Sequence, residues 1–194
     1  MIKKFKVMKK LRFYTVVLFL SMVCFWTPAK VNAQDTQLTR QEQKEARKAQ
    51  LYANFQAIDT LLQRKSIVLE ADFLSNQYGV RIPVTSSLNF IKIEPDNVIL
   101  QTGHNVGLGY NGVGGVTAEG SINSWKITKN LKHLYYTVRF TVTTNIGTYD
   151  VLMNIGADNN ATATITGLTR GQLTYDGKVK AVYNATVYKG QRSY

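Results

Sequence analysis

Two runs of alternating apolar and polar residues between Leu134 and Gly156 constrain the fold of this chain more than any other feature. In the first run, one side of an extended strand carries only apolar side chains: Leu134, Tyr136, Val138, Phe140 and Val142. The second run, from Tyr149 to Ile155, repeats the pattern after a short turn that contains Gly147. Side chains alternate between the two faces of a β-strand, so these runs predict an antiparallel hairpin with one buried face.

Further strand-like runs flank this hairpin, and no helical pattern separates them. They cover residues 66–74, 88–94, 97–102, 116–128, 160–166 and 172–183. A weaker stretch at residues 78–85 is interrupted by Pro83 and suits an edge strand or a loop. Short connections without helices favour antiparallel pairing, and long meanders tend to close because closure removes exposed edges. The sequence therefore predicts a mainly β fold of about eight antiparallel strands. An up-and-down barrel, lipocalin-like in outline, and a flattened barrel or sandwich both fit the pattern.

Two strands carry glycines whose roles differ. Gly120 lies inside the run 116–128 and predicts a bend there. Asp176-Gly177 fits either a hairpin turn or a bulge within a longer strand. We favour one bulged strand over residues 172–183, because the arms of the alternative hairpin are short.

A helix precedes the predicted strands. Thr39 and Glu42 have the spacing of a capping box, and Leu51, Phe55, Ile58 and Leu62 recur on one helical face. We expect a helix from about Thr39 to Arg64, with a charged first half in solvent and a second half packed on the sheet. The chain then divides into a signal peptide (1–33), a helical segment (34–65) and an antiparallel β domain (66–194).

The N-terminus has the pattern of an export signal. A lysine-rich start precedes an apolar run from Phe13 to Trp26, and Val31-Asn32-Ala33 resembles a cleavage site. We expect cleavage after Ala33 and a mature chain without a transmembrane helix, in the periplasm or cell envelope. The alternative is a lipoprotein anchored at Cys24, the single cysteine, but Val23 is larger than such processing prefers.

The net charge of +12 gives little support to nucleic-acid binding. Residues 1 to 33 hold seven basic residues and no acidic residue, which leaves 17 basic and 12 acidic residues, a net charge of +5, in the rest. This surplus is spread along the chain rather than gathered into a basic stripe.

Half of the 14 glycines lie between Gly103 and Gly120. Gly107 to Gly112 matches the dinucleotide pattern G-x-G-x-x-G, but a strand rather than a helix follows, so no pyrophosphate site is expected. A loop with several positive φ angles explains the glycines, and Gly114 is expected to adopt one. A functional interpretation is a flap over the barrel mouth. Its candidate ligand or partner residues are Tyr110, Asn111, Gly112, Gly114 and Gly115.

Catalytic and metal-binding patterns are scarce. His104 and His133 have no partner at the spacing of a zinc site, and both are expected at the surface. Glu70 and Asp72 lie two residues apart and are expected to share an exposed strand face. We predict no catalytic, metal-binding or cofactor-binding residue.

Three stretches resemble an uncharacterised family of exported Bacteroidota proteins, catalogued as domain of unknown function 4251. They are Ile67–Asp72, Asn111–Thr117 with Gly120, and Val187–Gly190. Ala181-Val182 stands where the family pattern has a proline. The resemblance implies an envelope location and one compact domain, and it implies no activity.

We therefore expect a non-enzymatic exported protein that binds a small apolar ligand or another envelope component. An outer-membrane barrel and a hydrolytic enzyme are the alternatives. A visible pair of nucleophile and base would favour the enzyme, and a clean lipid-facing band would favour the membrane barrel.

Overall fold

The computed structural model describes residues 39–104, 111–168 and 171–193, which form one α-helix, nine β-strands and a short 3-10 helix. In chain order the elements are α2 (Arg40–Gln63), β1 (Ile67–Asn76), β2 (Arg81–Pro83), β3 (Phe90–Ile93), β4 (Val98–Thr102), β5 (Val116–Asn130), β6 (Tyr135–Thr144), β7 (Gly147–Gly156), β8 (Asn160–Leu168), β9 (Gly171–Ala181) and η1 (Val182–Asn184).

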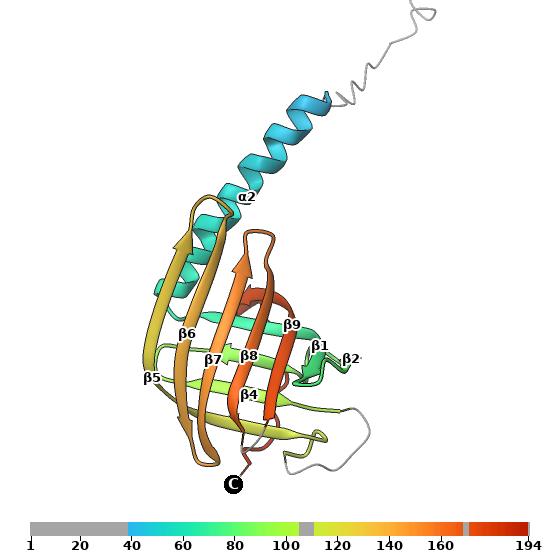
Figure 1. Ribbon diagram of the computed structural model, residues 1–194, viewed down its shortest axis with the longest axis vertical. Coiled ribbons are helices and arrows are strands. Elements are labelled where there is room, and N and C mark those ends of the chain that lie inside the picture. The colour runs from blue at the N-terminus through green and yellow to red at the C-terminus, as the bar shows by residue number, and fades with distance from the viewer. Residues whose placement is uncertain (1–38, 105–110, 169–170, 194) are drawn as a thin grey trace, which may run out of the picture. The chain divides into compact units, whose positions relative to one another are not determined.

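The strands form one antiparallel sheet that closes on itself. Neighbours follow the order β2-β1-β3-β4-β5-β6-β7-β8-β9, and β1 also pairs with β9. That pairing closes eight strands into a barrel and leaves β2 as an extra strand beside β1 (Figure 1). The predicted antiparallel barrel is confirmed, and it is closed rather than an open sandwich.

The barrel interior is an apolar core, and the alternation on β6 and β7 is confirmed. The predicted inward residues of β6 and β7 are buried: Tyr136, Val138, Phe140, Val142, Tyr149, Val151, Met153 and Ile155. The residues between them face outward and are mostly polar. There, hydroxyl groups bond across strands, as the Thr141 hydroxyl does to the Asp150 carboxylate at 2.7 Å. The sheet therefore has one apolar and one polar face, as period-2 alternation requires.

β5 bends at Gly120, as predicted, because it changes partners there. Val116 to Gly120 pairs with β4, and the strand from Gly120 onward pairs with β6. A Cβ atom at Gly120 would overlap the carbonyl oxygen of Thr143. Only glycine permits this close approach at a barrel corner.

The seam between β1 and β9 contains a bulge. Ala71 pairs with Gly177 and Phe73 with Asp176, so Asp72 is the extra residue. β9 runs unbroken past Asp176-Gly177, which confirms a single strand, but the bulged residue belongs to β1. A Cβ at Gly177 would overlap the carbonyl oxygen of Glu70, so glycine is needed for the close approach of β1.

The second half of α2 covers one end of the barrel. Its buried residues are Phe55, Ile58 and Leu62. The Phe55 ring stacks on Tyr136 with centroids 4.4 Å apart, and the Tyr136 hydroxyl donates to the Phe55 carbonyl at 3.1 Å. An ion pair between Lys129 of β5 and Asp59 of α2, at 3.1 Å, lies beside this contact. These contacts confirm that the apolar stripe docks on the sheet.

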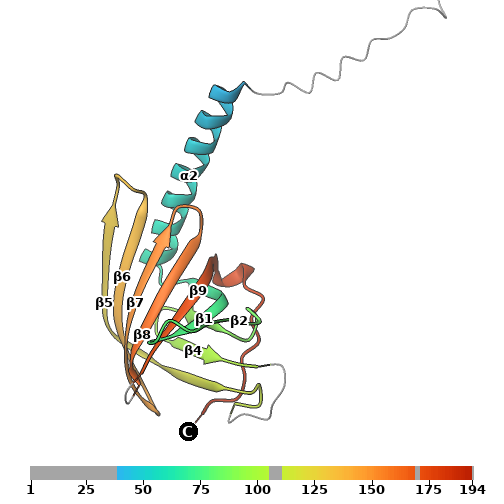
Figure 2. The same cartoon turned by 45° about the vertical axis from the view of Figure 1, so that its right-hand side comes forward.

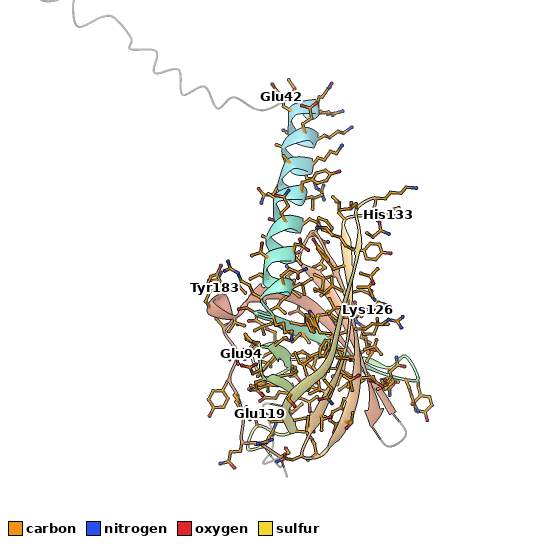
Figure 3. The ribbon with its side chains drawn as sticks, turned by 90° about the vertical axis from the view of Figure 1, so that its left-hand side faces the viewer. Glu42, Glu94, Glu119, Lys126, His133 and Tyr183 are labelled. Atoms are coloured by element: carbon orange, nitrogen blue, oxygen red, sulfur yellow. The ribbon has the colours of Figure 1, made fainter. Side chains whose placement is uncertain are left out.

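The first half of α2 is exposed throughout residues 40–50, as expected from its charges. Figure 3 shows Glu42 near the start of this exposed half. In the described part of the chain, no helix combines the length and apolar character that a membrane span requires.

Candidate functional site: the barrel mouth

The glycine loop is residues 103–115 between β4 and β5, and its described parts, residues 103–104 and 111–115, lie at the end of the barrel away from α2 (Figure 1). We call this end the barrel mouth. Of the predicted site residues, Tyr110 lies outside the described residues. Asn111, Gly112, Gly114 and Gly115 are described and lie together in the second half of the loop.

Asn111 is fully buried, and its side chain organises the loop. Its amide nitrogen donates to the Thr102 carbonyl and to the Thr117 hydroxyl, both at 3.0 Å. Its side-chain oxygen accepts from the backbone N–H groups of Val113 at 3.1 Å and Gly115 at 2.9 Å. All the hydrogen-bonding capacity of the amide is thus used within the protein.

The glycines allow the loop to fold tightly around Asn111. Gly112 has φ of +72° and Gly114 has φ of +75°, which confirms the expected positive φ at Gly114. A Cβ at Gly114 would lie 2.6 Å from the His104 carbonyl oxygen, whereas one at Gly112 would meet nothing within 4 Å. A Cβ at Gly115 would overlap the Thr102 carbonyl. Gly114 and Gly115 are therefore required by close backbone approach.

Residues 185–193, which we call the C-terminal strap, cross the outside of β1, β3 and β4 after η1 (Figure 2). Val182, Ala185 and Val187 pack against a small outer cluster. The buried members of that cluster are Val68, Phe90 and Ile99. The strap explains why the strands beneath it are buried on both faces.

The strap reaches the glycine loop through backbone contacts. The N–H of Gln191 donates to the Asn111 carbonyl at 2.8 Å. Ser193 makes two bonds with Thr117: its N–H donates to the Thr117 carbonyl at 3.0 Å, and the Thr117 N–H donates to its hydroxyl at 3.1 Å. The strap thus holds both the loop and the first residues of β5.

A buried glutamine connects these parts. Gln101 of β4 is fully buried, and its amide donates to the Leu88 and Tyr188 carbonyls at 3.1 and 2.8 Å. Its side-chain oxygen accepts from the Thr117 hydroxyl at 3.0 Å and from the Gly190 N–H at 2.8 Å. Leaving such a buried group unsatisfied costs about 1–3 kcal/mol, so the strap and β4 depend on each other.

Two carboxylates fix the strap further. Glu70 of β1 accepts from the Lys180 ammonium at 2.6 Å and from the Thr186 N–H at 3.0 Å. Its side chain is only 5% exposed, so the expectation that Glu70 lies on an exposed face is wrong. The strap covers that face, and the bulge at Asp72 interrupts the spacing that was expected to pair the two acids.

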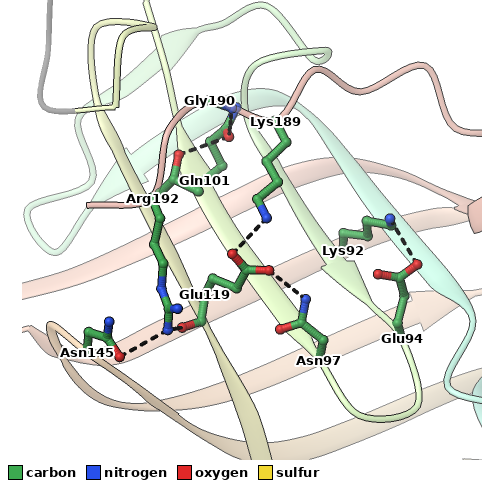
Figure 4. A network of polar contacts seen from close by, with 10 residues as sticks. Lys92, Glu94, Asn97, Gln101, Glu119, Asn145, Lys189, Gly190 and Arg192 are labelled. Carbon is green, nitrogen blue, oxygen red and sulfur yellow. Dashed lines mark hydrogen bonds and ion pairs between the residues drawn. The ribbon is translucent and has the colours of Figure 1, made fainter. Parts of the chain in front are cut away.

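Glu119 of β5 is the second carboxylate, and Figure 4 shows the groups around it. It accepts from the Lys189 ammonium at 2.7 Å and from the Asn97 amide at 2.9 Å. Arg192 donates to the Glu119 carbonyl at 3.1 Å and to the Asn145 side chain at 3.0 Å. The hydrogen bond from Lys189 is the main cause that lowers the pKa of Glu119, and it outweighs the opposing effect of burial.

An apolar pocket of about 200 Å³ opens inside the barrel at the mouth. Its described walls come from β4, β5, β7, β8 and β9. They are Leu100, Thr102, Val116, Ala118, Tyr149, Ile165, Leu173 and Tyr175. Beyond this pocket, large core side chains such as Tyr136, Phe140 and Met153 are buried in the barrel interior.

The few polar atoms in this wall already have partners. The Tyr175 hydroxyl donates to the Gln101 carbonyl at 3.1 Å, the Tyr149 hydroxyl lies 3.4 Å from the Ile146 carbonyl, and the Thr102 hydroxyl accepts from the Val116 N–H at 3.2 Å. Burial raises the pKa of both tyrosines, so both stay neutral. The described wall therefore presents no charged group to a ligand.

The remaining chemical candidates are not among the described residues that line the pocket. His104 and His133 are exposed, as expected. In the described ranges, no group of three or more histidine, cysteine or acidic side chains is arranged to hold a metal ion.

Sequence reasoning pointed to the glycine loop but missed the pocket wall and the buried polar groups. The wall residues alternate along their strands, as in Val116 and Ala118 or Leu173 and Tyr175. That alternation could have placed them on the inner face, although it carries no information on which end of the barrel is left unfilled. No local sequence pattern predicted the burial of Gln101 and Thr117, because that burial depends on the C-terminal strap, about 75 to 90 residues further along the chain.

The fold and site define a small closed antiparallel barrel with a helix over one end and an apolar pocket at the other. The family model for a domain of unknown function (DUF4251) matches residues 49–179, and the chain belongs to this family. A solved structure of a DUF4251 family protein from Bacteroides eggerthii is 25% identical, with a TM-score of 0.57. The similarity covers 69% of this chain and 91% of that one. A search of curated proteins gave no match.

Gly114→Val should destabilise the protein by about 2 kcal/mol or more, because valine is strained at positive φ and its Cβ would clash with the His104 carbonyl. Gly112→Val is the matched control, since it carries the same φ strain without the clash. Urea unfolding should rank Gly114→Val as clearly the less stable variant. Equal stabilities would show that the loop relaxes away from His104.

Acidification should selectively weaken the hold of the strap. The pKa of Glu119 is lowered by folding, so its stabilising contribution is present above the unfolded value and is lost as pH falls through the folded value. The wild type should be more stable than Glu119→Gln at neutral pH, and the difference should shrink as pH falls from about 5 towards 3. Urea melts across this range measure it.

Lys189→Met serves as the matched variant, because it removes the main cause of the shift in the pKa of Glu119. In that background, Glu119→Gln should change the pH dependence much less. A stability difference between wild type and Glu119→Gln that stays constant with pH would contradict this account.

Proposed function

We propose that this protein binds a small apolar ligand in the mouth pocket and is not an enzyme. The observation that carries the proposal is the pocket itself, about 200 Å³ with walls that are almost entirely apolar. Its hydroxyl groups at Thr102, Tyr149 and Tyr175 are each engaged within the protein. A site of this kind gains free energy by removing apolar ligand surface from water, at about 25 cal/mol per Å².

The size of the pocket limits the ligand. An apolar protein cavity of about 150 Å³ is large enough to hold benzene. The mouth pocket is somewhat larger, which suits a single substituted ring or the end of an alkyl chain. An envelope component is compatible with the proposal if it presents an apolar group of this size.

The chemistry of the wall favours binding over hydrolysis. The titratable side chains among its described residues are Tyr149 and Tyr175, and burial raises the pKa of each. Neither is a base at neutral pH, and no described nucleophile–base pair lines the pocket. The acid–base pair that hydrolysis requires is therefore missing from this part of the wall.

The outward faces of β5 to β8 argue against the alternative of an outer-membrane barrel. They carry mostly polar residues, such as Thr137, Arg139, Thr143 and Asn154, with single apolar residues such as Leu152 between them, while most apolar residues of the same strands are buried inside. A lipid-facing wall has the reverse arrangement, with an apolar outer band.

Ala118→Phe should reduce ligand binding at least tenfold. Ala118 is 5% exposed, faces the pocket and would place a phenyl ring in the empty volume. Because that volume exists, the change in melting temperature should be small. Titration calorimetry with hexyl maltoside, an uncharged short-chain probe, measures binding.

Thr166→Phe is the control, because it adds the same ring at an exposed position on the outside of β8. It should leave hexyl maltoside binding unchanged. The proposal fails if the wild type does not bind the probe, or if Ala118→Phe binds it as well as the wild type does.

In this proposal the protein is exported to the periplasm or cell envelope, because residues 1–33 have the pattern of a signal peptide. Mass analysis of protein from the producing cell should give a mature N-terminus at Gln34. An N-terminal diacylated Cys24 would instead show a membrane-anchored lipoprotein.

A further inference from the structure

The apolar inner face of the barrel continues past the pocket onto the hairpin of β1 and β2. Leu74 pairs with Tyr175 of β9 on one side and with Ile82 of β2 on the other. Directly paired residues project from the same face of a sheet, so Ile82, Leu74 and Tyr175 form one row. Tyr175 lines the pocket, and the row therefore starts there and leads outward.

A second row runs parallel to the first. Asn76 pairs with Leu173, which lines the pocket, and its N–H donates to the Val80 carbonyl at 3.1 Å. Val80 is two residues from Ile82 and so shares its face. We call Val80 and Ile82 the apolar lip.

The apolar lip is exposed, in contrast to the core beside it. Ile82 is 51% exposed and Val80 is 58% exposed, whereas Leu74 between lip and pocket is 7% exposed. Ile82 and Leu74 extend the apolar inner face from the pocket to β2, whereas the polar side chain of Asn76, which accepts from the Val80 N–H at 3.0 Å, lies between Leu173 and Val80. Exposed apolar side chains beside an apolar pocket often mark a binding site.

Contacts on the opposite face hold the hairpin in this orientation. The Arg81 guanidinium stacks over the Phe73 ring at 3.8 Å and pairs with the Asp176 carboxylate. Arg81 and Phe73 alternate with Ile82 and Leu74 along their strands, so they face outward. The charges stay on the outside, and the lip keeps its apolar side towards the mouth.

We propose that the ligand is an uncharged single-chain amphiphile whose alkyl tail is longer than the pocket. The end of the tail fills the pocket, and the rest crosses Leu74 and lies along Val80 and Ile82. This inference rests on the proposed function and extends it, since a compact ring would fill the pocket without reaching the lip. The neutral head group follows from the absence of a charged side chain among the described residues of the wall and lip.

Alkyl maltosides from hexyl to dodecyl, each kept below its micellar concentration, test the inference. Each buried methylene strengthens binding by up to about fourfold. In the wild type, affinity should rise at least tenfold from octyl to dodecyl. In the double variant Val80→Ser with Ile82→Ser, that rise should fall below about threefold, while hexyl maltoside binds as before.

Leu131→Ser is the matched control, because Leu131 is an exposed apolar residue, 67% accessible, in the turn between β5 and β6 at the other end of the barrel. It should keep the full dependence on chain length. The inference is overturned if the affinity of the double variant depends on chain length as strongly as that of the wild type. It is also overturned if the affinity of the wild type does not rise from octyl to longer chains. In both cases the pocket still binds the hexyl probe. If the wild type does not bind hexyl maltoside at all, the proposed function itself is overturned.

Discussion

The pairing of β1 with β9 is the constraint on which the rest of the structure depends. Without it, the sheet would have two open edges with unpaired backbone groups, and the apolar face would have no enclosed interior. Gly177 lets the backbone of β1 approach closely at the seam, and the extra residue at Asp72 shifts the register there by one residue. Glu70 and Lys180, which are diagonal neighbours across the seam, add a partly buried ion pair. The end that α2 covers and the mouth that contains the pocket both exist only because this seam is closed.

A second set of stabilising contacts consists of hydrogen bonds between the C-terminal strap and the outer face of the barrel. The C-terminal strap buries Gln101, Thr117 and Glu70 and at the same time supplies them with hydrogen-bond partners. Through Gln191 and Asn111 it also holds the glycine loop. The shape of the mouth is therefore set from outside by hydrogen bonds and from inside by apolar side chains. A ligand of the proposed kind would meet walls that are already positioned, which would limit the entropy lost on binding.

Local patterns predicted much of the fold. The alternation of apolar and polar residues identified the inner faces of β6 and β7. Gly120 indicated the bend of β5, and the spacing of four apolar residues predicted which face of α2 packs on the barrel. Features that arise between distant parts of the chain could not be predicted in this way. The burial of Glu70 results from a strap more than a hundred residues later, and the bulge at Asp72 is visible only against β9. At the site, the positive φ of Gly114 was predictable from local sequence. The pocket was not, because an unfilled volume reflects the sizes of side chains from five strands at once.

The long separation between the two strands of the seam has a consequence for biosynthesis. Glu70 and its partner Lys180 are 110 residues apart, so β1 leaves the ribosome long before β9 exists. During that interval the edge of β1 that later pairs with β9 has no partner, whereas β2 and β3, which pair with its other edge, follow soon after. Barrels dominated by such distant pairings fold in milliseconds to seconds, and their intermediates are prone to aggregate. The barrel therefore closes only after nearly the whole chain has been made, and it is expected to fold more slowly than a helical protein of this size.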